Sequence, residues 1–424
     1  MTIFEQLESN VRSYCRSFPI IFDKAKGDLL YSDKGGAYID FFAGAGALNY
    51  GHNNEYIKER ILDYLHSDRI MHGLDMYTKA KEDFIVTFSR QLLNAKGLNY
   101  KLQFTGPTGT NAVEAAFKLA RKVKKRTGIF AFMGAFHGMS LGSLAATSNK
   151  SSRAGAGISL DQVTFIPHPS GNFGGLDSIQ YMREILTDSH SGIDKPAAFI
   201  LETTQAEGGI YTLGAEFLIS LRQLCTEHDI LLIIDDIQVG CGRTGPFFSF
   251  EKAGIIPDMV VLSKSISGYG LPMSLLLFKP ELDLWEPGEH NGTFRGNQLA
   301  FVSAKAALEL RELTGLEEQV FYKEAYVKEF LEKEIKPLHP DITIRGLGLI
   351  WGIDVSGFAD EAKAKQIAAR CFENGLVIER AGRNDTVIKL MPPLTVSMEN
   401  LKTGCEIIKH SMEYAMDTLE LVVN

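Results

Sequence analysis

Residues 230–264 read ILLIIDDIQVGCGRTGPFFSFEKAGIIPDMVVLSK, and the two apolar runs in this stretch decide the fold. The first run, ILLIID, ends at Asp235, and Lys264 comes directly after the second run, MVVLS. Short, continuous apolar runs bounded by turn residues indicate strands that are buried on both faces of a sheet. A carboxylate and an amine therefore each stand at the end of a predicted strand, where open parallel sheets place their ligands.

The same alternation of short apolar runs and helical patterns extends to both sides of this stretch. Helical spacing of apolar residues marks 111–125 and 215–228. Strands are predicted at 101–105, 128–133, 197–202, 230–235, 259–263 and 274–278. The pattern predicts an α/β fold in which helices cover both faces of a mostly parallel sheet.

The chain, at 424 residues, is too long for one compact core. Its character changes near residue 300, where helices at 300–314 and 317–335 are followed by short strands near 348–355 and 386–390. A closing helix is predicted near 399–416. We expect a large ligand-binding domain over 54–300 and a smaller α+β domain over 301–424. The N-terminal segment, 1–53, is expected to pack with the small domain.

Composition excludes several classes of function. A net charge of −8 argues against nucleic-acid binding, which needs a basic face. The five cysteines show no CxxC spacing, so we expect neither a disulfide framework nor a zinc site, and no other metal-ligand cluster is visible. The first twenty residues lack a secretion signal, and no apolar run of about 18 residues could cross a bilayer. We therefore expect a cytoplasmic protein with no catalytic metal.

The residue types at the strand ends suit one kind of chemistry. A lysine amine can form a Schiff base with an aldehyde, and a carboxylate can keep a ring nitrogen protonated. Taken singly, a lysine is usually a surface residue and an aspartate at a strand end is usually a cap. The turn at Thr108, Gly109, Thr110 and Asn111 fits a phosphate site and an ordinary helix N-cap equally well.

Five segments in order resemble the class-III aminotransferases, which are pyridoxal-phosphate (PLP) enzymes of fold type I. The segments are TGPTGTNAVEAAFKLAR, AFHGMS, LETTQAEGG, IIDDIQVGCGRTG with VVLSKSISG, and TFRGNQLA. The resemblance runs from about residue 29 to 394. It implies a large domain with a mostly parallel seven-stranded sheet, a smaller α+β domain, PLP as cofactor and a homodimer as the smallest active unit.

Carried over position by position, the resemblance also implies roles for individual residues. Lys264 would form the Schiff base and act as general acid and base, and Asp235 would pair with the pyridine nitrogen. Phe136 and Ile237 would press on opposite faces of the ring, and Gln238 would contact its hydroxyl. The full implied set of cofactor contacts is Gly109, Thr110, Phe136, His137, Glu202, Asp235, Ile237, Gln238, Lys264 and, reaching across from a second subunit, Thr293.

The substrate-binding residues depart from the family pattern. Glu207 matches the glutamate that gates the substrate site, but Met139 and Lys389 stand where many members have arginine. Lysine offers a point charge instead of a two-donor fork, so the usual carboxylate contacts do not carry over intact. Arg295 is an additional cation that could replace one contact, and a surface or interface position fits it equally well. We expect a Glu207–Lys389 pair that opens for one substrate and closes for the other.

A narrower resemblance implies the reaction. It rests on FEQLESNVRSYCRSFP, DFFAGAGALNYGHNN, MHGLDM, QFTGPTGTNAVEAA and VIKLMPPLT. It implies that L-glutamate gives its amino group to L-aspartate 4-semialdehyde, yielding L-2,4-diaminobutyrate and 2-oxoglutarate, the first step of ectoine synthesis. Two alternatives remain: another ω-aminotransferase of the ornithine or 4-aminobutyrate type, and a regulator that binds PLP without turnover.

Overall fold

The computed structural model describes residues 2–170, 176–358 and 362–423. Within them, one large sheet has seven strands in the order β4-β12-β11-β10-β7-β5-β6. Only β12 runs antiparallel to its neighbours in that sheet, so the predicted mostly parallel seven-stranded sheet is confirmed. The strands are β4 (Lys101–Phe104), β5 (Ile129–Phe132), β6 (Val163–Ile166), β7 (Ala198–Leu201), β10 (Leu231–Asp235), β11 (Met259–Leu262) and β12 (Leu275–Phe278).

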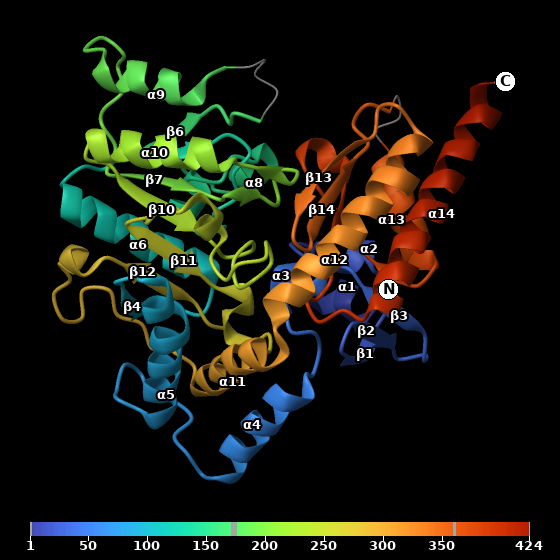
Figure 1. Ribbon diagram of the computed structural model, residues 1–424, viewed down its shortest axis with the longest axis horizontal. Helices are drawn as coiled ribbons and strands as arrows, with labels where there is room; N and C mark the ends of the chain where they lie inside the picture. The colour runs from blue at the N-terminus through green and yellow to red at the C-terminus, as the bar shows by residue number, and fades with distance from the viewer. Residues whose placement is uncertain (1, 171–175, 359–361, 424) are drawn as a thin grey trace.

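Alternate residues of the central strand β10 enter two different apolar cores. Leu232 and Ile234 pack in the core that includes α10 (Ala215–Glu227), whereas Leu231 and Ile233 pack in the core that includes α6 (Gly109–Lys124). Because successive side chains of a strand point to opposite faces, the two helices cover opposite faces of the sheet, as Figure 1 shows. The expected layers, helix on sheet on helix, are therefore present.

Six of the strands lie where the apolar runs predicted them, and β6 is the strand that the sequence analysis did not locate. β6 lies at the edge of the sheet beside β5, and three of its four residues are only partly buried. An edge strand needs fewer apolar residues than a central one, so its sequence, VTFI, stands out little from its surroundings.

A second layered unit is built from the C-terminal part of the chain. Its antiparallel sheet has the order β13-β14-β17-β16. These strands are β13 (Thr343–Leu347), β14 (Ile350–Asp354), β16 (Glu379–Ala381) and β17 (Val387–Leu390). The helices in this part of the chain are α11 (Gln298–Thr314), α12 (Leu316–Phe330), α13 (Lys363–Glu373) and α14 (Met398–Val423). α11 also packs in the core of the large sheet that includes α10. The predicted helix over 317–335 ends as an α-helix at Phe330 and continues as a π-helical turn, η6 (Leu331–Ile335).

The N-terminal segment joins this second unit through the backbone. Its strands β1 (Phe22–Lys26), β2 (Leu29–Ser32) and β3 (Ala37–Asp40) form one sheet with β15 (Leu376–Val377). β15 pairs in parallel with β3, and the N–H of Met391 donates to the carbonyl of Phe41 at 2.9 Å. The exact domain limits proposed above stay a prediction.

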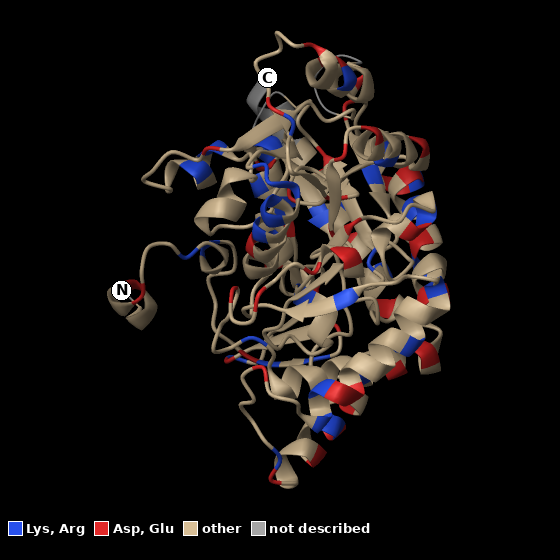
Figure 2. Cartoon of the chain, turned by 90° about the vertical axis from the view of Figure 1, so that its left-hand side faces the viewer, with Lys and Arg blue, Asp and Glu red and all other residues tan. Residues whose placement is uncertain are grey.

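The described residues also form several other α-helices. They are α1 (Ile3–Leu7), α2 (Tyr14–Ser17), α3 (Ala43–Gly46), α4 (Glu55–His66), α5 (Lys79–Phe88), α7 (Leu141–Ala145), α8 (Lys150–Ala154) and α9 (Ser178–Thr187). α1 buries none of its residues and lies apart from the body in Figure 2, where Lys and Arg are interspersed with Asp and Glu. Among the described residues, no helix is long and apolar enough to cross a membrane.

A buried arginine connects all three parts of the fold. Arg243, in the loop after β10, is fully buried. Its guanidinium donates to the carbonyl of Leu349 at 2.8 Å, to Asn49 Oδ1 at 2.6 Å and to the carbonyl of Pro392. Burial lowers its pKa to about 9, against a smaller opposing effect of Asp40, so it stays charged at neutral pH. One cation thereby satisfies an acceptor in the N-terminal segment, one in the turn between β13 and β14, and one just after β17.

We expect Arg243→Met to lower the free energy of unfolding by at least about 3 kcal/mol, because it leaves three buried acceptors without a donor. Urea denaturation followed by circular dichroism measures this loss. The matched control is Arg90→Met at an exposed arginine, which should change little. Equal stability of the two variants would contradict the role given to Arg243.

Candidate active site

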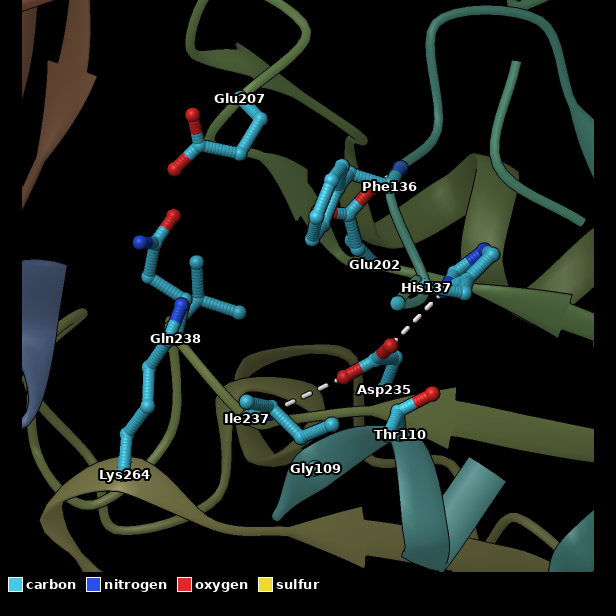
Figure 3. Close-up of a pocket in the computed structure, with 12 residues that line it drawn as sticks. Gly109, Thr110, Phe136, His137, Glu202, Glu207, Asp235, Ile237, Gln238 and Lys264 are labelled. Atoms are coloured by element: carbon cyan, nitrogen blue, oxygen red, sulfur yellow. Dashed lines mark hydrogen bonds and ion pairs between the residues drawn. The ribbon is translucent and has the colours of Figure 1, made fainter. Parts of the chain in front are cut away.

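One pocket gathers nearly all the residues that the sequence analysis singled out. It opens beyond the carboxyl ends of β5, β7, β10 and β11, and Figure 3 shows its walls. The lining residues are Gly109, Thr110, Phe136, His137, Gly138, Glu202, Glu207, Asp235, Ile237, Gln238, Val239 and Lys264. All the proposed cofactor contacts except Thr293 are therefore in one place. Gly138 and Val239 are additions that the motifs did not single out.

The parallel pairing of β10 and β11 brings Asp235 and Lys264 to this pocket. Asp235 is paired in register with Val261, so Lys264 lies three residues past that point on the adjacent strand end. Lys264 has a φ of +48°, a left-handed backbone conformation that costs a non-glycine residue of order 1 kcal/mol or more. Burial lowers its pKa, and the carboxylates of Glu207, Glu379 and Asp235 offset that effect only in part. At a given pH, a larger fraction of the amine is thus neutral and able to accept a proton.

Asp235 is fixed by one hydrogen bond to each of its carboxylate oxygens. Oδ1 accepts the N–H of Ile237 at 3.1 Å, and Oδ2 lies 2.7 Å from Nδ1 of His137. Both side chains are almost fully buried. The resemblance implies only that His137 contacts the cofactor, and the structure gives its ring a specific partner in Asp235. The contact orients the carboxylate, and the short Phe-His-Gly sequence alone could not indicate which acceptor the ring would meet.

The N-terminus of α6 forms the floor of the pocket on one side. A side chain at Gly109 would approach Cδ1 of Ile237 to 2.8 Å, so only glycine lets the helix end lie this close. The hydroxyl of Thr110 lies 2.6 Å from that of Ser140 and also contacts that of Ser143. Free N–H groups and hydroxyls at the N-terminus of a long helix suit a phosphate.

The residues present fit the PLP cofactor that the resemblance implies. Phe136 projects into the pocket from one side and Ile237 from the other, which suits a flat ring between them (Figure 3). The buried amide oxygen of Gln238 receives no hydrogen bond from the described residues, while its amide nitrogen donates to the carbonyl of Ala45 at 2.8 Å. The unused acceptor of Gln238 matches the ring hydroxyl of PLP, and the amine of Lys264 matches its aldehyde. The carboxylate of Asp235 matches the ring nitrogen, and the helix N-terminus matches the phosphate.

Glu202 lies behind Phe136 and accepts that residue's backbone N–H at 3.3 Å. Burial raises the pKa of Glu202 well above its usual range, and the neighbouring carboxylate of Asp235 adds to the effect. A second carboxylate nearby in a buried site disfavours the charged form. The surroundings of Glu202 thus favour its protonated form.

A buried cluster of charges lies at the opposite end of the pocket. Nζ of Lys389 is 2.8 Å from Oε1 of Glu207 and 2.6 Å from Oε1 of Glu379. Burial alone would raise the pKa of Glu207, but the ammonium groups of Lys389 and Lys264 lower it to about 2. The expected Glu207–Lys389 contact is therefore made. Glu379 was not singled out from sequence, because its contact depends on strand pairing between β16 and β17.

Thr293 and Arg295 lie outside the pocket. Thr293 is exposed. Arg295 donates to the carbonyl of His290 at 2.6 Å and pairs with Asp75 at 3.2 Å. In this chain, Arg295 therefore makes no contact with the Glu207–Lys389 pair. Across residues 2–170, 176–358 and 362–423, no group of three His, Cys, Asp or Glu side chains is arranged to hold a metal.

We expect the amine of Lys264 in cofactor-free protein to be labelled by acetic anhydride at lower pH than the amine of exposed Lys24, because burial lowers its pKa. Competitive labelling and mass spectrometry of one digest compare the two directly. Glu207→Gln should lower the midpoint for Lys264 further, since the Glu207 carboxylate raises that pKa. Equal midpoints for Lys264 and Lys24 would contradict the assignment.

Comparison with known proteins places the chain in a family. The family model described as aminotransferase class-III matches residues 12–412. A Bordetella parapertussis protein named diaminobutyrate–2-oxoglutarate transaminase is 53% identical over 98% of this chain and 96% of its own length. A Halalkalibacterium halodurans protein of the same name is 50% identical and covers 100% and 99% of the two chains.

Solved structures share the fold. The ornithine aminotransferase of Toxoplasma gondii aligns with a TM-score of 0.84 at 23% identity, covering 98% of this chain and 94% of that one. A transaminase from the marine bacterium Virgibacillus aligns with a TM-score of 0.87 at 18% identity, covering 98% and 99%. The match to the family model over most of the length, with relatives above 50% identity, shows that this chain belongs to the class-III aminotransferases, with PLP as its cofactor.

Proposed function

We propose that this aminotransferase moves the amino group of L-glutamate to L-aspartate 4-semialdehyde, giving L-2,4-diaminobutyrate and 2-oxoglutarate. This would be the first step of ectoine synthesis. The observation that carries the proposal is the 50–54% identity, over nearly the whole chain, to proteins named diaminobutyrate–2-oxoglutarate transaminase. That name describes the same reaction written in the opposite direction. The Lys389 ammonium beside Glu207 supports it, because one site must accept two substrates with different placements of charge.

The pocket residues divide the chemical work. When bound, PLP supplies an aldehyde that takes up the amino group and a ring that withdraws electrons from the carbon that loses its proton. Lys264, with its lowered pKa, would remove the α-proton of glutamate and hold it for the later proton return. Asp235, oriented by His137 and the Ile237 N–H, holds a proton at the ring nitrogen. Thr110 and the α6 N-terminus would bind the phosphate.

The two substrates differ next to the reacting carbon. Glutamate carries a carboxylate on that carbon, whereas the terminal aldehyde of the semialdehyde does not. A cation is therefore needed near the reacting carbon for one substrate only. We infer that Glu207 leaves Lys389 when the glutamate carboxylate arrives. When the semialdehyde is bound, Glu207 returns and pairs with the Lys389 ammonium, which then has no substrate carboxylate to bind.

We expect L-glutamate to bleach the yellow colour of the purified enzyme with formation of 2-oxoglutarate, and aspartate semialdehyde to restore it with formation of 2,4-diaminobutyrate. Lys264→Ala should slow the first step by at least about 10³-fold, because it removes the base. Lys24→Ala at an exposed lysine is the matched control. Bleaching by ornithine or 4-aminobutyrate but not by glutamate would overturn the substrate assignment. A yellow protein that none of these amines bleaches would favour a regulator that binds PLP without turnover.

A homodimer completes the proposed site. The segment 70–77 lies against the loop that holds Thr293: the rings of His72 and Phe294 are 5.3 Å apart, and Arg295 pairs with Asp75. Several large apolar side chains are exposed on this surface, namely Ile70, Met71, Leu74, Met76, Tyr77 and Phe294. An exposed apolar surface of this kind marks a protein interface, and a second copy of the chain would bring Thr293 to the phosphate of its neighbour.

We expect Tyr77→Asp combined with Phe294→Asp to shift the enzyme toward monomer in sedimentation velocity, because charge would be buried without a partner. The shift should be accompanied by weaker retention of PLP. Ile219→Asp is the matched control, since Ile219 is an exposed residue on α10. A double variant that stays dimeric would rule out this surface as the interface.

A further inference from the structure

Two carboxylates share the ammonium of Lys389, and they are held in very different ways. Glu379 is directly opposite Lys389 in the antiparallel pairing of β16 with β17. Residues opposite each other in such a pair have Cβ atoms about 5 Å apart, so the strand pairing itself fixes the contact. Glu207, in contrast, lies on the turn between the short strands β8 (Thr204–Gln205) and β9 (Tyr211–Thr212) and faces the pocket.

The exposure of the three side chains shows the same difference. The Lys389 side chain is 0% exposed and that of Glu379 is 8% exposed, whereas that of Glu207 is 31% exposed. Lys389 lies on the apolar side of β17 that also carries Val387 and Met391, both buried. Gly352, its neighbour on β14, has no side chain to offer. A carboxylate is thus required to keep the ammonium charged in these surroundings.

We propose that Glu379 is a positioning residue for the reaction: it is the fixed counter-ion that keeps Lys389 charged and in place while Glu207, the movable counter-ion, leaves to admit a substrate carboxylate. This inference rests on the proposed function, which requires Glu207 to leave for glutamate. With Glu379 present, the departure of Glu207 does not leave a buried, unpaired ammonium. With Glu379 neutralised, Glu207 is the sole counter-ion and its departure becomes costly.

The charges around the cluster are consistent with this division. Tyr14, Glu207, Lys264 and Lys389 are the titratable groups that act on or beside Glu379. Burial raises the pKa of Glu379 to about 7, the ammonium of Lys389 opposes the rise, and the Glu207 carboxylate adds to it. Oε1 of Glu379 has no hydrogen-bond donor among the described residues other than the Lys389 ammonium beside it. When the Glu207 carboxylate moves away, one of the effects that raise the pKa of Glu379 weakens, while Glu379 stays 2.6 Å from the ammonium of Lys389.

Glu379→Gln tests the role in catalysis, with the two half-reactions measured separately by stopped-flow absorbance. The glutamate half-reaction should slow at least about tenfold, because opening would leave a buried charge unpaired, whereas the semialdehyde half-reaction should change less than about twofold. Glu379→Asp, which keeps the charge, should recover part of the loss. Glu373→Gln, at an exposed glutamate paired with Arg370 on α13, is the matched control. Equal slowing of both half-reactions, or of neither, would overturn the proposal.

A stability measurement tests the same proposal without turnover. Either counter-ion alone should keep Lys389 in place, so Glu207→Gln and Glu379→Gln should each be tolerated, and the double variant should lose more stability than the two losses added together. Additive losses would overturn the inference. If the wild-type enzyme reacts with neither glutamate nor the semialdehyde, the proposed function fails, and this stability comparison still decides whether the two carboxylates share the lysine.

Discussion

The parallel pairing of β10 with β11 is the constraint on which the site depends. It places the ends of two fully buried strands side by side, so that the carboxylate of Asp235 and the amine of Lys264 enter one pocket. Other groups act on that pair: His137 and the Ile237 N–H orient the carboxylate, and Lys264 adopts a left-handed backbone conformation just after the strand.

The pocket keeps several charges out of water without leaving a cation unpaired. At one end, burial and the neighbouring Asp235 raise the pKa of Glu202; at the other, Lys389 is shared by Glu207 and Glu379. Lys264 lines the same pocket. Burial lowers its pKa, and the carboxylates of Glu207, Glu379 and Asp235 oppose part of that effect. The basicity of one amine is therefore a property of the whole cluster.

The sequence predicted the parts of the fold that depend on local pattern. Fully buried strands such as β10 and β11 are visible as apolar runs, whereas the half-buried edge strand β6 is not. Most of the site followed from residues at strand ends and from ordered family motifs. Glu379 did not, because its contact with Lys389 arises from the pairing of two strands whose register no local pattern records. The position of Arg295 depends likewise on Asp75, 220 residues away.

The bonds of Arg243 have a consequence for cooperativity. Its guanidinium takes one acceptor from the N-terminal segment and two from the flanks of the smaller sheet, while its backbone belongs to the loop that follows β10. If any one of these regions opened, the buried guanidinium of Arg243 would lose part of its hydrogen-bond partners while it remained inside the other regions. We therefore expect the loop after β10, the N-terminal segment and the smaller sheet to unfold together, so that their amide protons exchange with solvent through the same rare event.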